Sequence, residues 1–315
     1  MYFLKKNISS CLYIFFIFLT FNFIEFSTKG VLAKTFVVSK IEVEEKYNLN
    51  FNKLKVMDRG FKKAFQDISQ MVLERKDLDK IKNTKINDIK KLIENFSILD
   101  EKFINQKYKS VMEVEFNRKK LIKFLDAKNI TISLPKKINI LFIPIIIDLE
   151  TNNFYYLNEN IFTENWGSIE KNYFQISYII PNEDAEDYIS IKNNLEDIEN
   201  YNFQKILNKY YSENFIIMII FKSKNNIKFY SKINFDDKFE ILSKNFKDKN
   251  INNQTDLNSM IINIKNEYED KWKSINKMSP SSSVPIRLSL ESNNTEKSLK
   301  LENALDNLDF VNSYN

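Results

Sequence analysis

A nearly unbroken apolar run at residues 138–147, directly after two lysines, constrains the fold more than any other feature of this sequence. A run of that length bounded by charge predicts a strand covered on both faces, as in an open α/β sheet. Pro144 lies within the run and has no backbone N–H, so it predicts a sheet edge or a bulge at its position. We therefore expect an α/β protein built around this strand.

The residues before this strand predict an α+β domain at residues 35–130 with the order β-α-β-β-α. Apolar residues alternate in its first strand and then recur at helical spacing through a long amphipathic helix. Asn117 stands at the N-cap position of its last helix. The expected elements are strands at 35–44, 96–103 and 108–116 and helices at 54–72, 86–94 and 118–126.

Residues 136–275 predict an open α/β domain around the apolar strand. Its last helix carries one apolar stripe, and two of its strands are expected to form a hairpin. The expected elements are strands at 138–147, 174–180, 215–221 and 227–235 and helices at 161–171, 185–198, 203–211, 238–246 and 256–275.

The end of the chain predicts a linker and the start of another unit. Residues 276–284 contain Pro280 and three consecutive serines, which is typical of a linker. Residues 285–315 predict one strand, at 285–290, and one helix, at 296–308. One strand and one helix cannot bury their own apolar faces, so we expect an incomplete third domain or docking onto the earlier ones.

The N-terminus has the pattern of a secretory signal peptide at residues 1–33. Lys5 and Lys6 precede an apolar stretch, and small residues at the −3 and −1 positions predict cleavage after Ala33. The alternative is an uncleaved inner-membrane anchor formed by residues 11–26, although Glu25 is costly inside lipid. In either case we expect the rest of the chain in the periplasm, with membrane contact only if the signal is retained.

Composition excludes several classes of function. The chain has no histidine, its single cysteine is Cys11 in the signal, and it has only three glycines. Imidazole or thiolate metal sites, Ser-His and Cys-His nucleophiles and phosphate-binding loops are therefore excluded, and we expect no cofactor. Loss of residues 1–33 lowers the formal charge from +5 to +3, and lysines alternate with acids throughout, so we expect no nucleic-acid partner.

A few side chains remain as candidates for chemistry, and none is assigned a catalytic, cofactor-binding or metal-binding role. Ser168 and Lys171 have the S-x-x-K spacing, but the companion elements of that catalytic motif are missing. An acidic cluster predicts a capped helix, with a weak Ca²⁺ site as the alternative. A second acidic pair predicts a helix cap or a carboxylate pair, and both tryptophans predict core packing. These residues are Glu183, Asp184, Glu186 and Asp187, then Asp236 and Asp237, then Trp166 and Trp272.

The order of elements resembles a known family. The relevant segments are the helix that begins Val-Met-Asp-Arg-Gly-Phe-Lys-Lys-Ala-Phe at Val56, and Leu134-Pro135 followed by the strand Ile-Asn-Ile-Leu-Phe-Ile-Pro at Ile138. Over residues 36–245 the chain is similar to a proteobacterial family of exported proteins, of marine alphaproteobacterial type, known as a domain of unknown function. That resemblance implies an envelope location and no particular activity.

Three functions stay open on the sequence. The first is a non-catalytic interaction or assembly protein of the envelope, which predicts a groove or sheet edge lined by apolar residues and an envelope protein as partner. The second is a carboxylate-dependent hydrolase of envelope polymers, which predicts two acids in one cleft. The third is a small-ligand binder with an enclosed pocket between the two α/β units.

Overall fold

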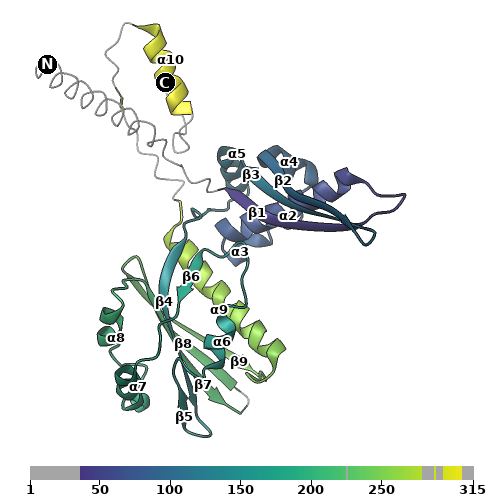
Figure 1. Cartoon of the computed structure of the whole chain (residues 1–315). Coiled ribbons are helices and arrows are strands. Elements are labelled where there is room, and N and C mark those ends of the chain that lie inside the picture. Colours follow the sequence, from purple (N-terminus) through teal and green to yellow (C-terminus); the bar gives the residue numbers. More distant parts are fainter. Residues whose placement is uncertain (1–35, 225, 279–286, 289–293, 307–315) are drawn as a thin grey trace, which may run out of the picture. The chain divides into compact units, whose positions relative to one another are not determined.

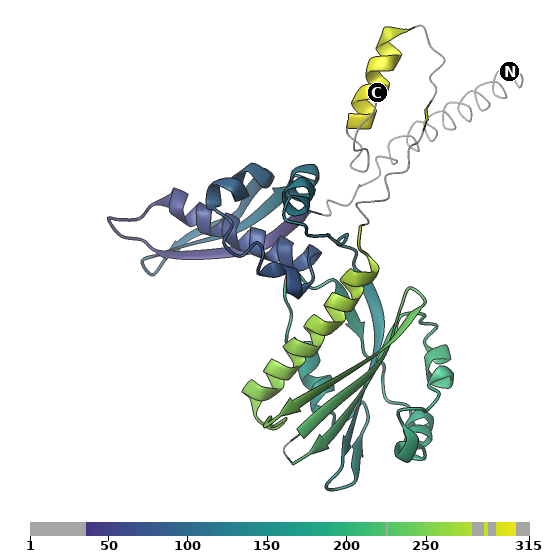
Figure 2. The same ribbon diagram turned by 180° about the vertical axis from the view of Figure 1, so that it is seen from behind.

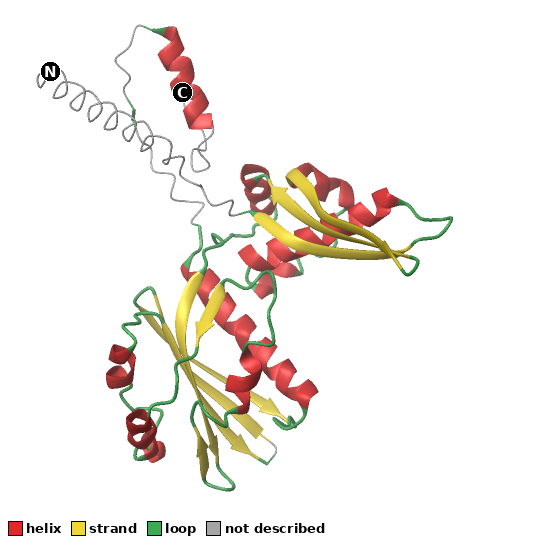
Figure 3. Ribbon diagram, in the orientation of Figure 1, coloured by secondary structure: helices red, strands yellow, loops and turns green. Residues whose placement is uncertain are grey.

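The computed structural model describes residues 36–224, 226–278, 287–288 and 294–306. Helices and mixed sheets alternate along these residues, so the predicted α/β class is confirmed (Figures 1 and 3). The predicted signal peptide and its cleavage site lie outside the described residues. Within the described part of the chain, no helix is both long enough and apolar enough to cross a membrane.

The first part of the chain forms a three-stranded antiparallel sheet with the order β1-β3-β2. Its helices share one hydrophobic core with one face of the sheet. The strands are β1 (Val37–Lys46), β2 (Ile93–Ile104) and β3 (Lys107–Phe116), and the helices are α2 (Lys53–Val72), α3 (Arg75–Leu78), α4 (Ile86–Leu92) and α5 (Arg118–Asp126).

Local signals account for several of these elements, although α3 is not predicted by the sequence and β2 begins at Ile93, inside the predicted helix at 86–94. The Asn117 side chain accepts a hydrogen bond from Lys120 N and caps α5, as expected. Asn105 and Gln106 both have positive φ, at 51° and 57°, so a two-residue turn joins β2 to β3. The helix α2 approaches β3 closely at Gly60, where an added Cβ would lie 2.5 Å from Met112 Sδ.

The second part of the chain forms a mixed six-stranded sheet. The main order is β5-β4-β7-β8-β9, and β6 also pairs with β4. Strand β4 is parallel to β6 and β7, and the remaining pairs are antiparallel. The strands are β4 (Ile138–Asp148), β5 (Asn153–Tyr155), β6 (Ile176–Ile179), β7 (Phe215–Ser223), β8 (Asn226–Phe235) and β9 (Lys238–Lys247).

Helices cover this sheet on both faces (Figures 1 and 2). On one face α9 (Gln254–Ile275) and α6 (Ile161–Trp166) share a core with the sheet. On the other face α7 (Ala185–Lys192) and α8 (Gln204–Lys209) complete a second core. Every residue of β4 except Asn139 is buried, so the predicted two-sided cover of this strand is confirmed.

Pro144 does not lie in an edge strand, because β4 is flanked on both sides. Its neighbour β6 pairs with residues 138–141 and β5 with residues 146–148, so no described strand pairs with the Pro144 side of β4 between them. The Pro144 carbonyl instead accepts a hydrogen bond from Asn160 Nδ2 at 3.1 Å. The prediction of an edge is thus correct only for this short gap.

The predicted helix at 238–246 is wrong, because these residues form strand β9. Asp236 and Asp237 have φ of 46° and 60°, so they form a two-residue turn that folds β9 back onto β8. Apolar residues of β9 therefore alternate between an exposed face and a partly buried one. The local spacing alone resembled a helix.

Two predicted helices are shorter than expected. The helix predicted at 161–171 ends at Trp166, followed by Gly167 as its C-cap. The helix predicted at 185–198 ends at Lys192, and Asn194 then donates its side-chain amide to Ser190 O at 2.8 Å. A short 3-10 turn, Leu195–Asp197, follows.

The predicted linker at 276–284 begins as ordered structure. Ser133 and Lys277 form an isolated bridge, and Met278 N donates to Ile132 O at 2.9 Å. Residues 279–284 lie outside the described part of the chain, as does most of the predicted strand at 285–290. The helix predicted at 296–308 is present as α10 (Thr295–Asp306).

Candidate functional site

The most distinctive surface of the described chain is the free edge of strand β2. Among the described residues, only β3 pairs with β2, and no described strand lies on the other side of this 12-residue strand. All of its residues after Ile93 are exposed. A free edge of that length presents a row of backbone N–H and C=O groups that another strand can pair with.

Large apolar side chains lie along this edge. Phe96, Leu99 and Phe103 are 46%, 55% and 58% exposed, and Ile98 and Ile104 are exposed as well. Natural edge strands usually carry charges or are covered, and a long apolar edge is a site for association. We call residues Phe96, Ile98, Leu99, Phe103 and Ile104 the β2 apolar row.

Part of this row belongs to the core-facing side of the sheet. Phe96 and Ile98 lie opposite Val114 and Met112 of β3, which are fully buried under the helices, and Phe103 lies opposite the equally buried Tyr108. Side chains on that side of β2 would normally be buried too. They are exposed on β2, so the helices that bury the same side of β3 do not cover these side chains.

Two side chains of α2 contact β2. Phe61 of α2 contacts Phe96 with ring centroids 5.1 Å apart, and Lys53 pairs with Glu101 at 2.7 Å. The main packing of α2 is with β1, at the opposite edge of the sheet. Tyr47 adds one more contact, with its ring centroid 4.9 Å from that of Phe103.

The charged side chains of β2 are held by local partners. Lys102 pairs with Asp100 at 2.6 Å, and Glu94 accepts a hydrogen bond from Asn117 Nδ2. The hydrogen bond from Lys53 lowers the pKa of Glu101. The strand therefore carries three carboxylates and one lysine, a net charge of −2, around its apolar row.

In the part of the chain that the structure describes, the second sheet has a free edge at β9, which carries more lysines than β2. Phe239 and Ile241 are exposed there, but Lys238, Lys244 and Lys247 are distributed along the strand. Lysines on an edge oppose pairing with another strand. The edge of β2 has only Lys102, so it is the better candidate of the two.

Ser168 and Lys171 do not form the helical arrangement that a catalytic Ser-Lys pair requires. Both residues lie beyond the end of α6, so no helical turn brings the amine to the hydroxyl. The Ser168 hydroxyl instead donates to Asn165 O at 2.7 Å. The S-x-x-K spacing therefore has no catalytic geometry here.

The acidic cluster forms a helix cap, as predicted. Asp184 Oδ1 accepts hydrogen bonds from Glu186 N and Asp187 N at 2.8 and 3.2 Å and so caps α7. Lys209 pairs with Asp187 at 2.6 Å, so a lysine ammonium already neutralises this carboxylate. Among the described residues, no group of three or more acids, histidines or cysteines is arranged to hold a metal ion.

The remaining predicted residues are structural. Trp166 and Trp272 lie in the core, as predicted, and Trp272 Nε1 donates to Lys136 O at 2.6 Å. Asp236 and Asp237 form the β8–β9 turn, so the predicted helix cap is wrong. Asp236 pairs with Lys136 at 2.9 Å.

The sequence predicts β2 as a strand, but its position at an exposed edge was not predicted. The signal was present, because apolar residues at positions 96, 98, 99, 103 and 104 do not alternate with polar ones as a half-buried strand requires. The burial of Lys265, a charged residue on the apolar stripe of α9, was not predicted either.

Comparison of the sequence with protein-family models and with curated proteins gives no match. The resemblance to an exported proteobacterial family therefore stays a prediction, and the case for function depends on the geometry above.

Proposed function

We propose that this protein is an interaction module of the cell envelope that binds an extended segment of a partner protein by adding it as a strand beside β2. The single observation that carries the proposal is the exposed apolar row on a free 12-residue edge. Strand addition uses the free backbone groups for affinity and alternate side chains for specificity.

The geometry favours an extended segment over a docked helix. A helix satisfies its own backbone groups and would leave those of β2 unpaired, whereas a strand pairs with them directly. A strand beside β2 also continues the core-facing side of the sheet. Its alternate apolar side chains would cover Phe96, Ile98 and Phe103.

The charge on β2 indicates which residues the partner segment should carry. Like charges directly opposite each other destabilise a strand pair, and opposite charges stabilise it by roughly 0.2–1 kcal/mol. Since β2 carries a net −2, we expect the partner segment to alternate apolar residues with at least one lysine or arginine.

The proposal is tested by placing a charge on the edge. Leu99→Lys leaves the buried core intact, because Leu99 is 55% exposed and lies at a register irregularity opposite no single β3 residue. Phe239→Lys makes the matched change on the edge of β9, at a residue 56% exposed. Full-length variants with their own N-terminus are cross-linked in cells, and the products are identified by mass spectrometry.

We expect one partner to cross-link to the wild type and to Phe239→Lys but not to Leu99→Lys. An equal yield from all three proteins would contradict strand addition at β2. Recovery of only a cross-linked pair of this chain would contradict the proposal as well, because the occupant would then be a second copy.

Residues 1–33 support the envelope location that we propose. Their charged, apolar and small-residue regions have the order that export requires. N-terminal sequencing of the protein from membrane-free periplasmic extract should begin at Lys34. A protein that retains Met1 and remains with the membrane would instead indicate an anchor at residues 11–26.

A further inference from the structure

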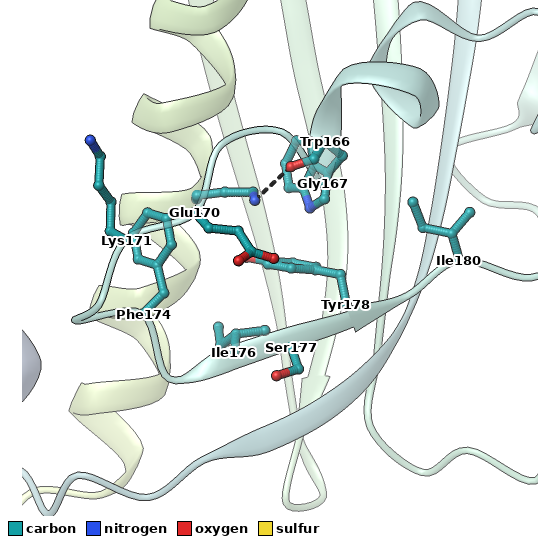
Figure 4. Close-up of a pocket in the computed structure, with 10 residues that line it drawn as sticks. Trp166, Gly167, Glu170, Lys171, Phe174, Ile176, Ser177, Tyr178 and Ile180 are labelled. Atoms are coloured by element: carbon teal, nitrogen blue, oxygen red, sulfur yellow. Dashed lines mark hydrogen bonds between the residues drawn. The ribbon is translucent and has the colours of Figure 1, made fainter. Parts of the chain in front are cut away.

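A pocket of about 280 Å³ lies between the segment that follows α6, strand β6 and helix α9 (Figure 4). The aromatic side chains of Trp166, Phe174 and Tyr178 line it together with charged side chains. Its volume is just below the roughly 300–1,000 Å³ that drug-sized ligands occupy, so it suits a smaller molecule. The sequence predicts the pocket of a small-ligand binder between the two α/β units. This pocket instead lies within the second unit, which contains the six-stranded sheet.

One buried cation stands in this pocket. Lys265 is 3% exposed, and its ammonium donates to Trp166 O and Ile169 O, both at 2.7 Å; the first bond is the dashed line in Figure 4. An ammonium has three N–H donors, so these carbonyls use two of them. The rings of Trp166, Phe174 and Tyr178 surround the nitrogen at 5.1 to 5.7 Å.

Two further polar atoms at the pocket are buried without a partner. Trp166 is 1% exposed, and its Nε1 has no hydrogen-bond acceptor. The Tyr178 hydroxyl is also buried and unpaired. Native proteins rarely leave buried donors unpaired, and both residues line this pocket, so the two donors are candidate partners for an acceptor.

These groups define the ligand chemistry. One cation and two unpaired N–H or O–H groups favour an anionic acceptor, and the aromatic walls favour an apolar body beside it. Glu170 also lines the pocket and repels anions, so Lys265 can compensate only one negative charge on a ligand. A cationic ligand is disfavoured because Lys265 already occupies the aromatic box.

We propose that this pocket binds a small monocarboxylate, with its carboxylate at Lys265, Trp166 Nε1 and the Tyr178 hydroxyl and its apolar body between the aromatic walls. Burial lowers the pKa of Lys265 to about 8, so the ammonium still predominates near pH 7. The pocket and the β2 edge share no residues, so this site is independent of the proposed interaction function.

The test uses three molecules of the same shape and different charge on the folded full-length protein. Phenylacetate, 2-phenylethanol and 2-phenylethylamine are titrated at pH 6.5 and followed by ligand-observed NMR and calorimetry. We expect phenylacetate to bind with a Kd of about 1 mM or tighter. The alcohol should bind at least about tenfold more weakly, because it lacks the charge-assisted hydrogen bonds.

Three variants locate the binding. Lys265→Met should abolish phenylacetate binding, whereas Lys171→Met removes an exposed lysine of the same lining and should leave it unchanged. Tyr178→Phe removes the unpaired hydroxyl and keeps the ring, so it should weaken phenylacetate binding about tenfold without loss of folding, and it serves if Lys265→Met fails to fold.

Several results would overturn the proposal. They are no saturable binding of phenylacetate, equal binding of all three molecules, preference for the amine, or unchanged affinity for phenylacetate in Tyr178→Phe.

Discussion

The ring of Phe61 on α2 lies edge-on to the ring of Phe96 on β2, with centroids 5.1 Å apart and planes at 75°. This contact joins the helix layer to the edge strand of the first sheet. Phe96 is still 46% exposed, and Phe103 further along the same strand is 58% exposed. Phe96, Ile98 and Phe103 of the β2 apolar row therefore extend the core-facing side of the sheet, and the described part of the chain leaves them exposed.

Gly60→Ala should destabilise the first sheet. An added Cβ at Gly60 would lie 2.5 Å from Met112 Sδ, whereas nothing lies within 4 Å of a Cβ added at Gly167. We expect a loss of about 1–3 kcal/mol for Gly60→Ala. Gly167 has φ of −70°, so Gly167→Ala should be neutral or stabilising by up to about 1 kcal/mol. Urea denaturation compares the two, and equal effects would show that α2 does not pack this closely on β3.

Asp148→Ala should destabilise the second sheet. Asp148 is buried at the end of β4, where it accepts from Lys222 Nζ at 2.7 Å and from Glu150 N at 3.0 Å. Loss of these bonds should cost about 2–3 kcal/mol. Glu186→Ala removes an exposed partner of Lys205 and should change stability by less than about 0.5 kcal/mol. Thermal unfolding of the two variants checks this, and a cost below that of Glu186→Ala would contradict the role of Asp148.

Asp237→Gly should stabilise the β8–β9 hairpin. Asp236 and Asp237 both have positive φ, which glycine adopts without the steric cost that a Cβ brings. We expect a gain of about 0.5–1 kcal/mol. Asn253, the N-cap of α9, has negative φ, so Asn253→Gly serves as the control. We expect it to lower the free energy of unfolding slightly. A loss in both variants would argue against the turn.

Lys265 should make stability depend on pH. Burial, opposed by the charges of Glu170 and Glu269, lowers its pKa from 10.5 to about 8. Between these two values the unfolded chain binds the proton more tightly, so stability rises with pH there, by up to about 3 kcal/mol. Tyr178 and Tyr268 have pKa values raised by burial and oppose this trend above pH 10.

The measurement for this prediction is the free energy of unfolding of the wild type and Lys265→Met at pH 7 to 10. Lys273 also has a lowered pKa, but it is present in both proteins, so their difference isolates Lys265. Above pH 8 the free energy of unfolding of the wild type should rise relative to that of Lys265→Met. A constant difference across that range would contradict a buried ammonium at this position.

Most elements could be predicted from local patterns, and the errors have a common physical cause. The run at 138–147 and the stripe of α9 are long and periodic, so burial determines their form. Residues 238–246 were misassigned because the two aspartates before them fit a helix cap as well as a turn. Both aspartates have positive φ, so they form the turn. No sequence pattern specifies positive φ for this residue type.

The candidate site was only partly predictable. Sequence patterns show that β2 is a strand, but its place at the edge depends on the pairing order β1-β3-β2, which is a tertiary property. The exposure of Phe103 depends in turn on where α2 lies over the sheet. Lys265 could be predicted as a charge on an apolar stripe, but not as the cation of an aromatic pocket, because its partners come from residues almost 100 positions earlier.

The most direct test of strand addition is a photo-cross-linking scan in cells, with p-benzoylphenylalanine in place of Leu99 or Phe103 on β2. Phe239 on β9 and Tyr211, which is 95% exposed outside any strand, are the control positions. We predict that both β2 positions cross-link to one segment of one partner, at sites about four residues apart, as two paired strands require. Sites scattered over the partner, or equal cross-linking from Phe239 and Tyr211, would contradict the account.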